Sequence, residues 1–314
     1  MRPFAMFLSA VLIGVSPLAT SAQQVEPRPT FRGGVARVAV AATVRDKRGR
    51  PVTTLSAEDF RLFVNGQPRE ILEFSRDAAP VALGLLADVS GSMEIGEKRL
   101  AMREVTHHLV SALAPNADQV GLFAFDQGLE EVLSLRPAPA GILERLDGIK
   151  SYGRTSLFDA VAEASRRLVE SAGPRRAVIV LTDGYDNASQ LTPGEVSGLA
   201  SSIDVPVYVI VIVSPMDRSG DSSLIDVQLQ ALRDGPLGNL ARWTGGDIMM
   251  PVTQAAISSA ARQVVYELRH QYLMAFEPGG QSGWHPLELR TRVPNLTVRA
   301  RSGYVVPAQP GSRQ

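Results

Sequence analysis

Three short segments of the chain carry oxygen-bearing side chains of the kind that bind hard metal ions. The first follows the pattern Asp88-x-Ser90-x-Ser92, with one carboxylate and two hydroxyls at alternate positions of a glycine-containing loop. The second segment offers the hydroxyl of Thr155, and the third offers the carboxylate of Asp183. Because the five side chains supply oxygens alone, they favour Mg²⁺ first, with Mn²⁺ or Ca²⁺ as alternatives.

Such a site would leave room for a ligand from outside the chain. Mg²⁺ takes about six oxygen ligands and keeps water where the protein supplies fewer. If Asp183 acts through a bound water, the cation stays electron-poor and favours one more anionic oxygen. We therefore expect the site to accept an Asp or Glu carboxylate of a protein partner.

Each segment also has an ordinary structural interpretation. Asp and Ser often hydrogen-bond their own backbone in turns, Thr155 could cap the helix that follows it, and Asp183 stands before a glycine as in a plain turn. We expect Asp186 and Asn187 to shape their loop rather than bind metal. The hydroxyls of Ser90 and Thr155 are expected at loop edges rather than in the core.

The surrounding pattern predicts the elements that would bring these segments together. Short apolar runs indicate buried strands at 81–87, 120–125, 177–181 and 205–213. Helical patterns lie between and after them, at 98–114, 156–172, 193–202 and 254–269. The alternation predicts an α/β fold with a doubly wound, mostly parallel, Rossmann-like sheet. Its three loops should emerge at the carboxyl edge of the sheet, where such folds bind ligands.

Strand patterns of period two flank this α/β segment on both sides. The alternation from Val38 to Val44 predicts a half-buried strand, and Asn65-Gly66 predicts a hairpin. Further strands are expected at 272–276, 287–290 and 296–301. We expect the two flanks to pair in one small β unit, with the boundaries 35–78 for its N-terminal part, 80–268 for the α/β domain and 270–306 for its C-terminal strands.

The first residues resemble a secretory signal peptide over 1–22, followed by a linker over 23–34; the last segment, 307–314, is expected to be a tail. Arg2 precedes an apolar run, and Thr20-Ser21-Ala22 fits the small-residue cleavage rule. This predicts export to the periplasm, the medium or the cell surface; an uncleaved membrane anchor is the alternative. No later segment is expected to form a transmembrane helix.

Composition excludes several other functions. The chain has 314 residues, no cysteine and 32 basic against 32 acidic side chains. Without cysteine it can form no disulfide, thiolate metal site or thiol nucleophile. A net charge of zero provides no field that would draw nucleic acid, so no nucleic-acid partner is expected.

Taken together, the five residues resemble the metal-ion-dependent adhesion site of von Willebrand factor A domains, and the resemblance covers roughly residues 80–265. It implies that the serines and the threonine bind the cation by their hydroxyls and that a ligand carboxylate completes the shell. The flanks, with 46–74, 284–287 and 301–304, resemble exported "VWFA-related" proteins described from Acidobacteria. Arg154 departs from the pattern, because many relatives carry glycine there.

The leading hypothesis is a non-enzymatic, metal-dependent protein-interaction or adhesion module. A metal-dependent hydrolase is disfavoured because His, Glu and Lys are absent from the three loops. Two further alternatives remain: an accessory subunit of an ATP-driven chaperone or chelatase-type assembly, and a structural domain whose metal clamps the loops.

Overall fold

The computed structural model describes residues 37–137, 141–171, 173, 175–202, 204–214, 222–279 and 281–306. The predicted signal peptide, linker and tail lie outside these residues. Within the described part of the chain, no helix is long and apolar enough to cross a membrane.

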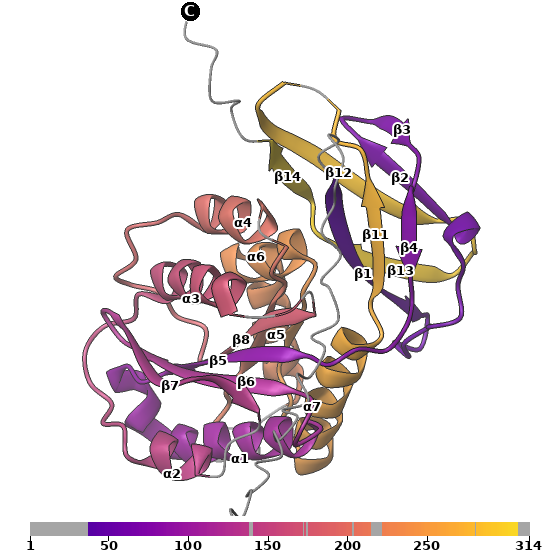
Figure 1. Ribbon diagram of the computed structural model, residues 1–314. Coiled ribbons are helices and arrows are strands. Elements are labelled where there is room, and N and C mark those ends of the chain that lie inside the picture. The colour runs from indigo at the N-terminus through magenta and orange to yellow at the C-terminus, as the bar shows by residue number, and fades with distance from the viewer. Residues whose placement is uncertain are drawn as a thin grey trace, which may run out of the picture. The chain divides into compact units, whose positions relative to one another are not determined.

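A six-stranded sheet forms the centre of the α/β half, in the order β10-β9-β8-β5-β6-β7 (Figure 1). Its strands are parallel except β7, which runs antiparallel to β6. They are β5 (Ala82–Asp88), β6 (Gln119–Phe125), β7 (Leu129–Pro137), β8 (Arg176–Thr182), β9 (Val207–Val211) and β10 (Ile248–Met249). The predicted fold class, a doubly wound and mostly parallel sheet, is confirmed.

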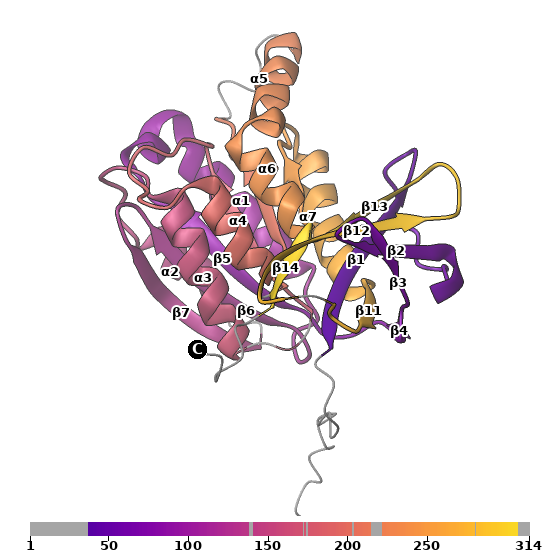
Figure 2. The same cartoon turned by 90° about the horizontal axis from the view of Figure 1, so that it is seen from above.

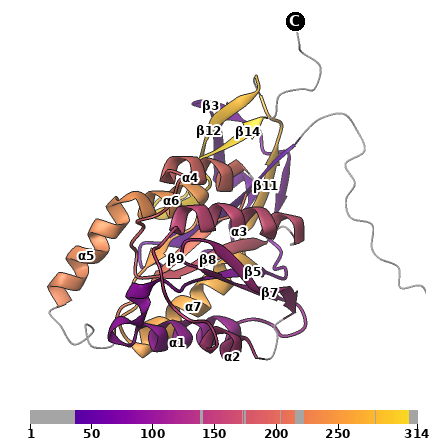
Figure 3. The ribbon, with the colours of Figure 1, turned by 90° about the vertical axis from the view of Figure 1, so that its left-hand side faces the viewer.

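Helices cover both faces of this sheet (Figure 3). Leu83 and Leu85 of β5 face one apolar cluster shared with α1, α2 and α7, whereas Leu86 faces a second cluster shared with α3, α4 and α6. Burial on both faces explains why the strands are apolar without alternation. The helices are α1 (Lys98–Ser111), α2 (Ile142–Asp147), α3 (Leu157–Ser171), α4 (Pro193–Ser202), α5 (Ser222–Asp234), α6 (Pro236–Thr244) and α7 (Gln254–Arg269).

The periodic patterns gave no range for β7, α2, α5, α6 or β10, although residues 240–246 resemble the last helix and turn of von Willebrand factor A domains and overlap the end of α6. The edge strand β7 is mostly exposed or half-buried, so it has no apolar run, and β10 has only two residues. The predicted helix over 98–114 ends at Ser111, and the predicted strand over 205–213 shortens to β9.

The two flanks pair with each other, as predicted. One antiparallel sheet has the order β13-β1-β11-β4 and a second has β14-β12-β2-β3; Figure 2 shows them beside α7. Their inward side chains share one apolar core, so the two sheets form a sandwich. The strands are β1 (Val38–Asp46), β2 (Phe60–Val64), β3 (Gln67–Arg69), β4 (Glu73–Ser75), β11 (Tyr272–Phe276), β12 (Gly283–Thr291), β13 (Leu296–Ala300) and β14 (Gly303–Val306), and a 3₁₀ turn, Ala57–Asp59, precedes β2.

The prediction that β1 is half-buried is wrong. All of its residues from Val40 to Val44 are buried, because both of its faces are covered. One face lies in the sandwich core with Val40 and Val44. On the other, Thr43 accepts hydrogen bonds from Arg299, which also pairs with Glu267 of α7.

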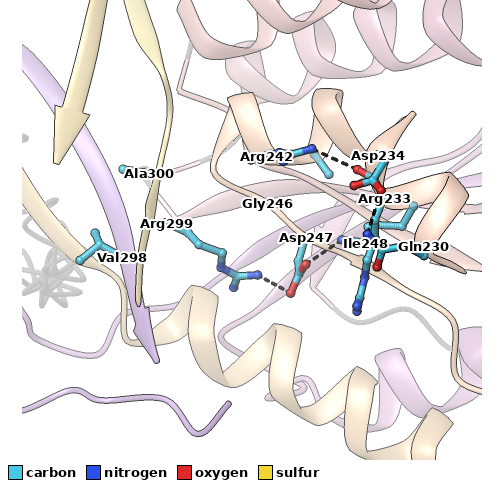
Figure 4. Close-up of a pocket in the computed structure, with 12 residues that line it drawn as sticks. Gln230, Arg233, Asp234, Arg242, Gly246, Asp247, Ile248, Val298, Arg299 and Ala300 are labelled. Carbon is cyan, nitrogen blue, oxygen red and sulfur yellow. Dashed lines mark hydrogen bonds and ion pairs between the residues drawn. The ribbon is translucent and has the colours of Figure 1, made fainter. Parts of the chain in front are cut away.

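An ion cluster joins the sandwich to the α/β half. Arg45 of β1 lies 2.7 Å from Asp247 and donates a 2.9 Å bond to Glu267. Arg299 of β13 pairs with the same two carboxylates and lies 2.5 Å from Asp247, the contact drawn in Figure 4. The Glu267 side chain is only 1% exposed, so its charge depends on the two guanidinium groups for compensation.

We predict that Glu267→Gln will destabilise the protein by about 3–5 kcal/mol, because it leaves two partly buried arginines with one carboxylate. Urea denaturation would measure the loss. Glu288→Gln is the control, since the Glu288–Arg290 pair is exposed and its removal should leave the midpoint nearly unchanged. Equal midpoints for both variants would show that the buried cluster contributes no more to stability than an exposed ion pair does.

Candidate metal centre

The first loop begins where β5 ends, and its polar groups turn inward. Asp88 is fully buried, and its Oδ1 accepts a 2.9 Å bond from the backbone N–H of Ser90. The hydroxyls of Ser90 and Ser92 lie 3.2 Å apart. The side chains of this Asp-x-Ser-x-Ser segment thus gather on one side of the loop.

Thr182, the last residue of β8, holds the other carboxylate oxygen of Asp88. Its Oγ1 donates a 2.6 Å bond to Asp88 Oδ2 and accepts a 3.1 Å bond from the N–H of Gly184. Burial raises the pKa of Asp88, hydrogen bonds from Ser90 and Thr182 oppose that rise, and the nearby charge of Asp183 adds to it. Burial therefore disfavours the ionised form of Asp88 in the free chain.

Backbone hydrogen bonds tie the second loop to the first. Tyr152 N–H donates to Val89 O at 2.9 Å, and Gly91 N–H donates to Gly153 O at 3.3 Å. Gly153 has φ +88°, a left-handed conformation that glycine adopts without strain. This turn positions Thr155, which is 2% exposed, beside the first loop.

The third loop closes the group. Thr155 N–H donates to Asn187 Oδ1 at 2.9 Å, and Asn187 N–H returns a 3.0 Å bond to Thr155 O. Asp186 Oδ1 accepts the N–H of Leu157 at the start of α3. Asp186 and Asn187 therefore shape the loops through hydrogen bonds. Arg154 also contributes to loop structure, since its guanidinium donates to the carbonyl of Asn187.

Asp183 is buried, with 5% exposure, and its two oxygens differ. Oδ2 accepts a 2.9 Å bond from Lys98 Nζ, whereas no donor among the described residues reaches Oδ1. Lys98 is the first residue of α1 and stands outside the three loop motifs, so the motifs did not predict its contact with the site. Its Nζ also lies 3.4 Å from the carbonyl of Ser92.

Hydrogen bonds thus link Asp88 to the backbone of Ser90, and the Ser90 hydroxyl to that of Ser92. Lys98 connects Asp183 to Ser92, because its ammonium contacts both residues. Thr155 joins through its backbone bonds to the neighbouring loops. The expectation that Ser90 and Thr155 lie at loop edges is wrong, because both are buried. Their burial follows from the loop-to-loop hydrogen bonds, which fold the segments over one another.

The donor set fits a hard cation. The group has two carboxylates and three hydroxyls, and Asp183 Oδ1 is a buried acceptor without a donor, which is unfavourable unless a cation compensates it. No cluster of three or more His, Cys, Asp or Glu side chains suited to a metal occurs in the described segments. A site here would therefore rely on hydroxyls and on ligands from outside the chain.

Three exposed apolar side chains lie close in sequence to the candidate ligands. Ile95 and Tyr152 are each 67% exposed, and Tyr185 is 62% exposed. One comes from each of the three loops or their immediate continuation, within three residues of a candidate ligand. We call these three exposed side chains, Ile95, Tyr152 and Tyr185, the apolar rim of the candidate site.

A separate pocket of about 400 Å³ lies between α5, α6 and β13 (Figure 4). Arg233, Arg242, Asp247 and Arg299 are among its lining residues. None of the five candidate metal ligands lines it, so it is distinct from the metal centre.

Comparison with known proteins identifies the part of the chain that contains this site. Residues 83–185 match the family model described as von Willebrand factor type A domain. Uncharacterized proteins of Mycobacterium tuberculosis and Mycobacterium bovis are 30% identical over 165 residues, which is 52% of this chain and 23% of theirs. The chain therefore spans about a quarter of the length of these relatives.

Two solved structures also align with the chain. A von Willebrand factor type A protein from Catenulispora acidiphila aligns with 89% of this chain and 76% of its own, at 14% identity and a TM-score of 0.47. The conserved hypothetical protein BatB from Bacteroides thetaiotaomicron aligns with 60% of this chain and 98% of its own, at 19% identity and a TM-score of 0.45.

We predict that Thr182→Val will lower the free energy of unfolding by about 1–3 kcal/mol, because it leaves Asp88 Oδ2 and the N–H of Gly184 without their buried partner. Thr182→Ser should recover most of the loss. Chemical denaturation in the presence of a chelator would measure both. Wild-type stability of Thr182→Val would contradict this role.

Proposed function

We propose that the part of the chain that matches the von Willebrand factor type A domain model, residues 83–185, holds a divalent cation and uses it to bind an acidic side chain of a protein partner. Asp88, Ser90, Ser92, Thr155 and Asp183 would hold the cation, with Mg²⁺ as the first candidate and Mn²⁺ or Ca²⁺ as alternatives. When bound, it would supply a positive centre for the partner's Asp or Glu carboxylate.

The observation that carries this proposal is the state of the two buried carboxylates. Asp88 has a raised pKa, with burial as the largest cause, and Asp183 Oδ1 has no hydrogen-bond donor in the described structure. Burial of the Asp88 charge and the lack of a donor to Asp183 Oδ1 both destabilise the metal-free chain, and a bound cation would compensate both. Three hydroxyl-bearing residues on hydrogen-bonded loops supply further oxygens of the type that a hard cation takes.

The apolar rim supports a protein as the partner. Protein interfaces commonly combine exposed aromatic or aliphatic anchors with a small number of polar contacts. Tyr152, Tyr185 and Ile95 would surround the charged contact and exclude water from it. A partner segment with a carboxylate flanked by apolar side chains fits both features.

The function proposed is binding rather than catalysis. Among the described residues, Lys98 is the lysine that contacts the candidate ligands, and because it pairs with Asp183 it offers no free base for activating water. We also propose that the protein acts after export, in the periplasm or at the cell surface, on the basis of its N-terminal sequence.

The direct test is titration of Mg²⁺ and Mn²⁺ by calorimetry. Asp88→Ala should weaken binding by at least about 100-fold, since loss of even an outer-shell group often costs 10–100-fold. Asp147→Ala, which removes an exposed carboxylate paired with Arg103, should bind as the wild type does. Equal affinities for wild type and Asp88→Ala would reject the metal centre.

The rim can be tested by capture of partners from the exported fraction. A partner retained by the wild type should be lost on addition of chelator and retained at least about tenfold less by Tyr185→Ser, as expected for an aromatic anchor. Val227→Ser removes an equally exposed apolar side chain from α5 and should have no effect. Metal affinity should be the same in all three proteins; capture unaffected by Tyr185→Ser would exclude the rim.

A further inference from the structure

Lys98 places a cation of the protein's own inside the proposed metal centre. Its Nζ lies 2.9 Å from Asp183 Oδ2 and 3.4 Å from the carbonyl of Ser92, so it contacts two residues of the predicted ligand set. The side chains of Lys98 and Asp183 are 18% and 4% exposed, respectively. This is a desolvated ion pair rather than a solvent-screened surface contact.

The local backbone directs Lys98 to this position. Gly96 and Glu97 both adopt left-handed conformations, with φ +65° and +60°, and reverse the chain just before α1 begins. A Cβ on residue 96 would lie 2.6 Å from Ser214 Oγ, so the reversal is closely packed and requires glycine. Glu97 adopts a conformation that non-glycine residues rarely take, which indicates a constrained junction.

The helix itself does not favour a lysine at this point. Lys98 is the first residue of α1, and the N-terminus of a helix carries partial positive charge that favours anions over cations. Asp183 offsets this unfavourable placement. The lysine therefore depends on the site carboxylate, and the carboxylate depends on the lysine when no metal is bound.

We propose that Lys98 is a built-in competitor for the metal centre: its ammonium neutralises Asp183 in the metal-free protein and must leave when a divalent cation binds. This inference rests on the proposed metal-binding function and adds a residue that regulates the affinity of the site for its cation. A divalent cation bound to Asp183 would lie close to the ammonium that occupies its Oδ2, and two positive charges repel strongly in a desolvated site.

The competition has two consequences. It keeps the loops assembled without metal, and it lowers the affinity of the centre so that occupancy follows the concentration of the free cation. By linkage, bound metal releases Lys98, and loss of Lys98 favours metal by the same free energy.

The test is Mg²⁺ titration of the full chain by calorimetry, with thermal melting in chelator and in Mg²⁺. Lys98→Met should bind Mg²⁺ about tenfold more tightly than the wild type, a change typical of coupled sites. In chelator, Lys98→Met should melt at a lower temperature than the wild type. Addition of Mg²⁺ should raise its melting temperature by more than that of the wild type. Lys98→Gln, which keeps a donor without the charge, provides the same comparison if Lys98→Met folds poorly. The exposed Lys150→Met controls for net charge and should bind as the wild type does.

Equal or weaker Mg²⁺ binding by Lys98→Met and Lys98→Gln, with clear binding by the wild type, would overturn the competitor role and leave the metal centre intact. Absence of Mg²⁺ binding in the wild type and in both lysine variants would instead reject the proposed function on which the inference rests.

Discussion

Two carboxylates held out of water at the ends of adjacent strands are the constraint that organises this molecule. Asp88 ends β5 and Asp183 follows β8, and the two strands pair in parallel at the centre of the sheet. Burying ionised groups is costly unless hydrogen bonds or opposite charges compensate them. Thr182, the Ser90 backbone and Lys98 each provide part of that compensation. The mutual bonds of the three loops keep these compensating groups in place.

A second buried charge cluster serves a different purpose, at the junction of the two halves. Arg45 and Arg299 come from the sandwich, whereas Asp247 and Glu267 come from the α/β half. Here opposite charges are matched within the chain, two against two. At the sheet edge the carboxylates outnumber the one ammonium, and this difference separates a structural cluster from a candidate binding site.

The fold class followed from sequence because its signals are local and periodic. Apolar runs such as that of β8, and the helical spacing of α3, predict a covered parallel sheet without knowledge of tertiary contacts. The edge strand β7 lacks such a signal because few of its side chains are buried. The burial of Thr43 on β1 depends on Arg299, which lies 256 residues away, and no local pattern contains that information.

The candidate site was predictable in part for the same reason. Asp88, Ser90, Ser92 and Asp183 stand directly after strands, and topology brings such positions to one edge. The backbone reversal at Gly96 and Glu97, which returns Lys98 to the site, depends on packing against Ser214. The hydrogen bond from Thr182 to Asp88 could not be predicted, because a threonine at the end of a buried strand has many possible partners.

The pairing of β1 with β11 and β13 has a consequence for how the chain reaches its native state. Arg45 pairs with Glu267, which lies 222 residues later in the chain. Ala42 lies opposite both Tyr272 and Ala300 in the sheet. Contacts so distant along the chain slow folding, because a long loop must close before they form. The apolar face of β1 therefore stays uncovered until β11 and β13 have been synthesised, and an unpaired strand of this kind is prone to aggregation. Early exposure of β1 is thus a consequence of its pairing with strands that lie so far along the chain.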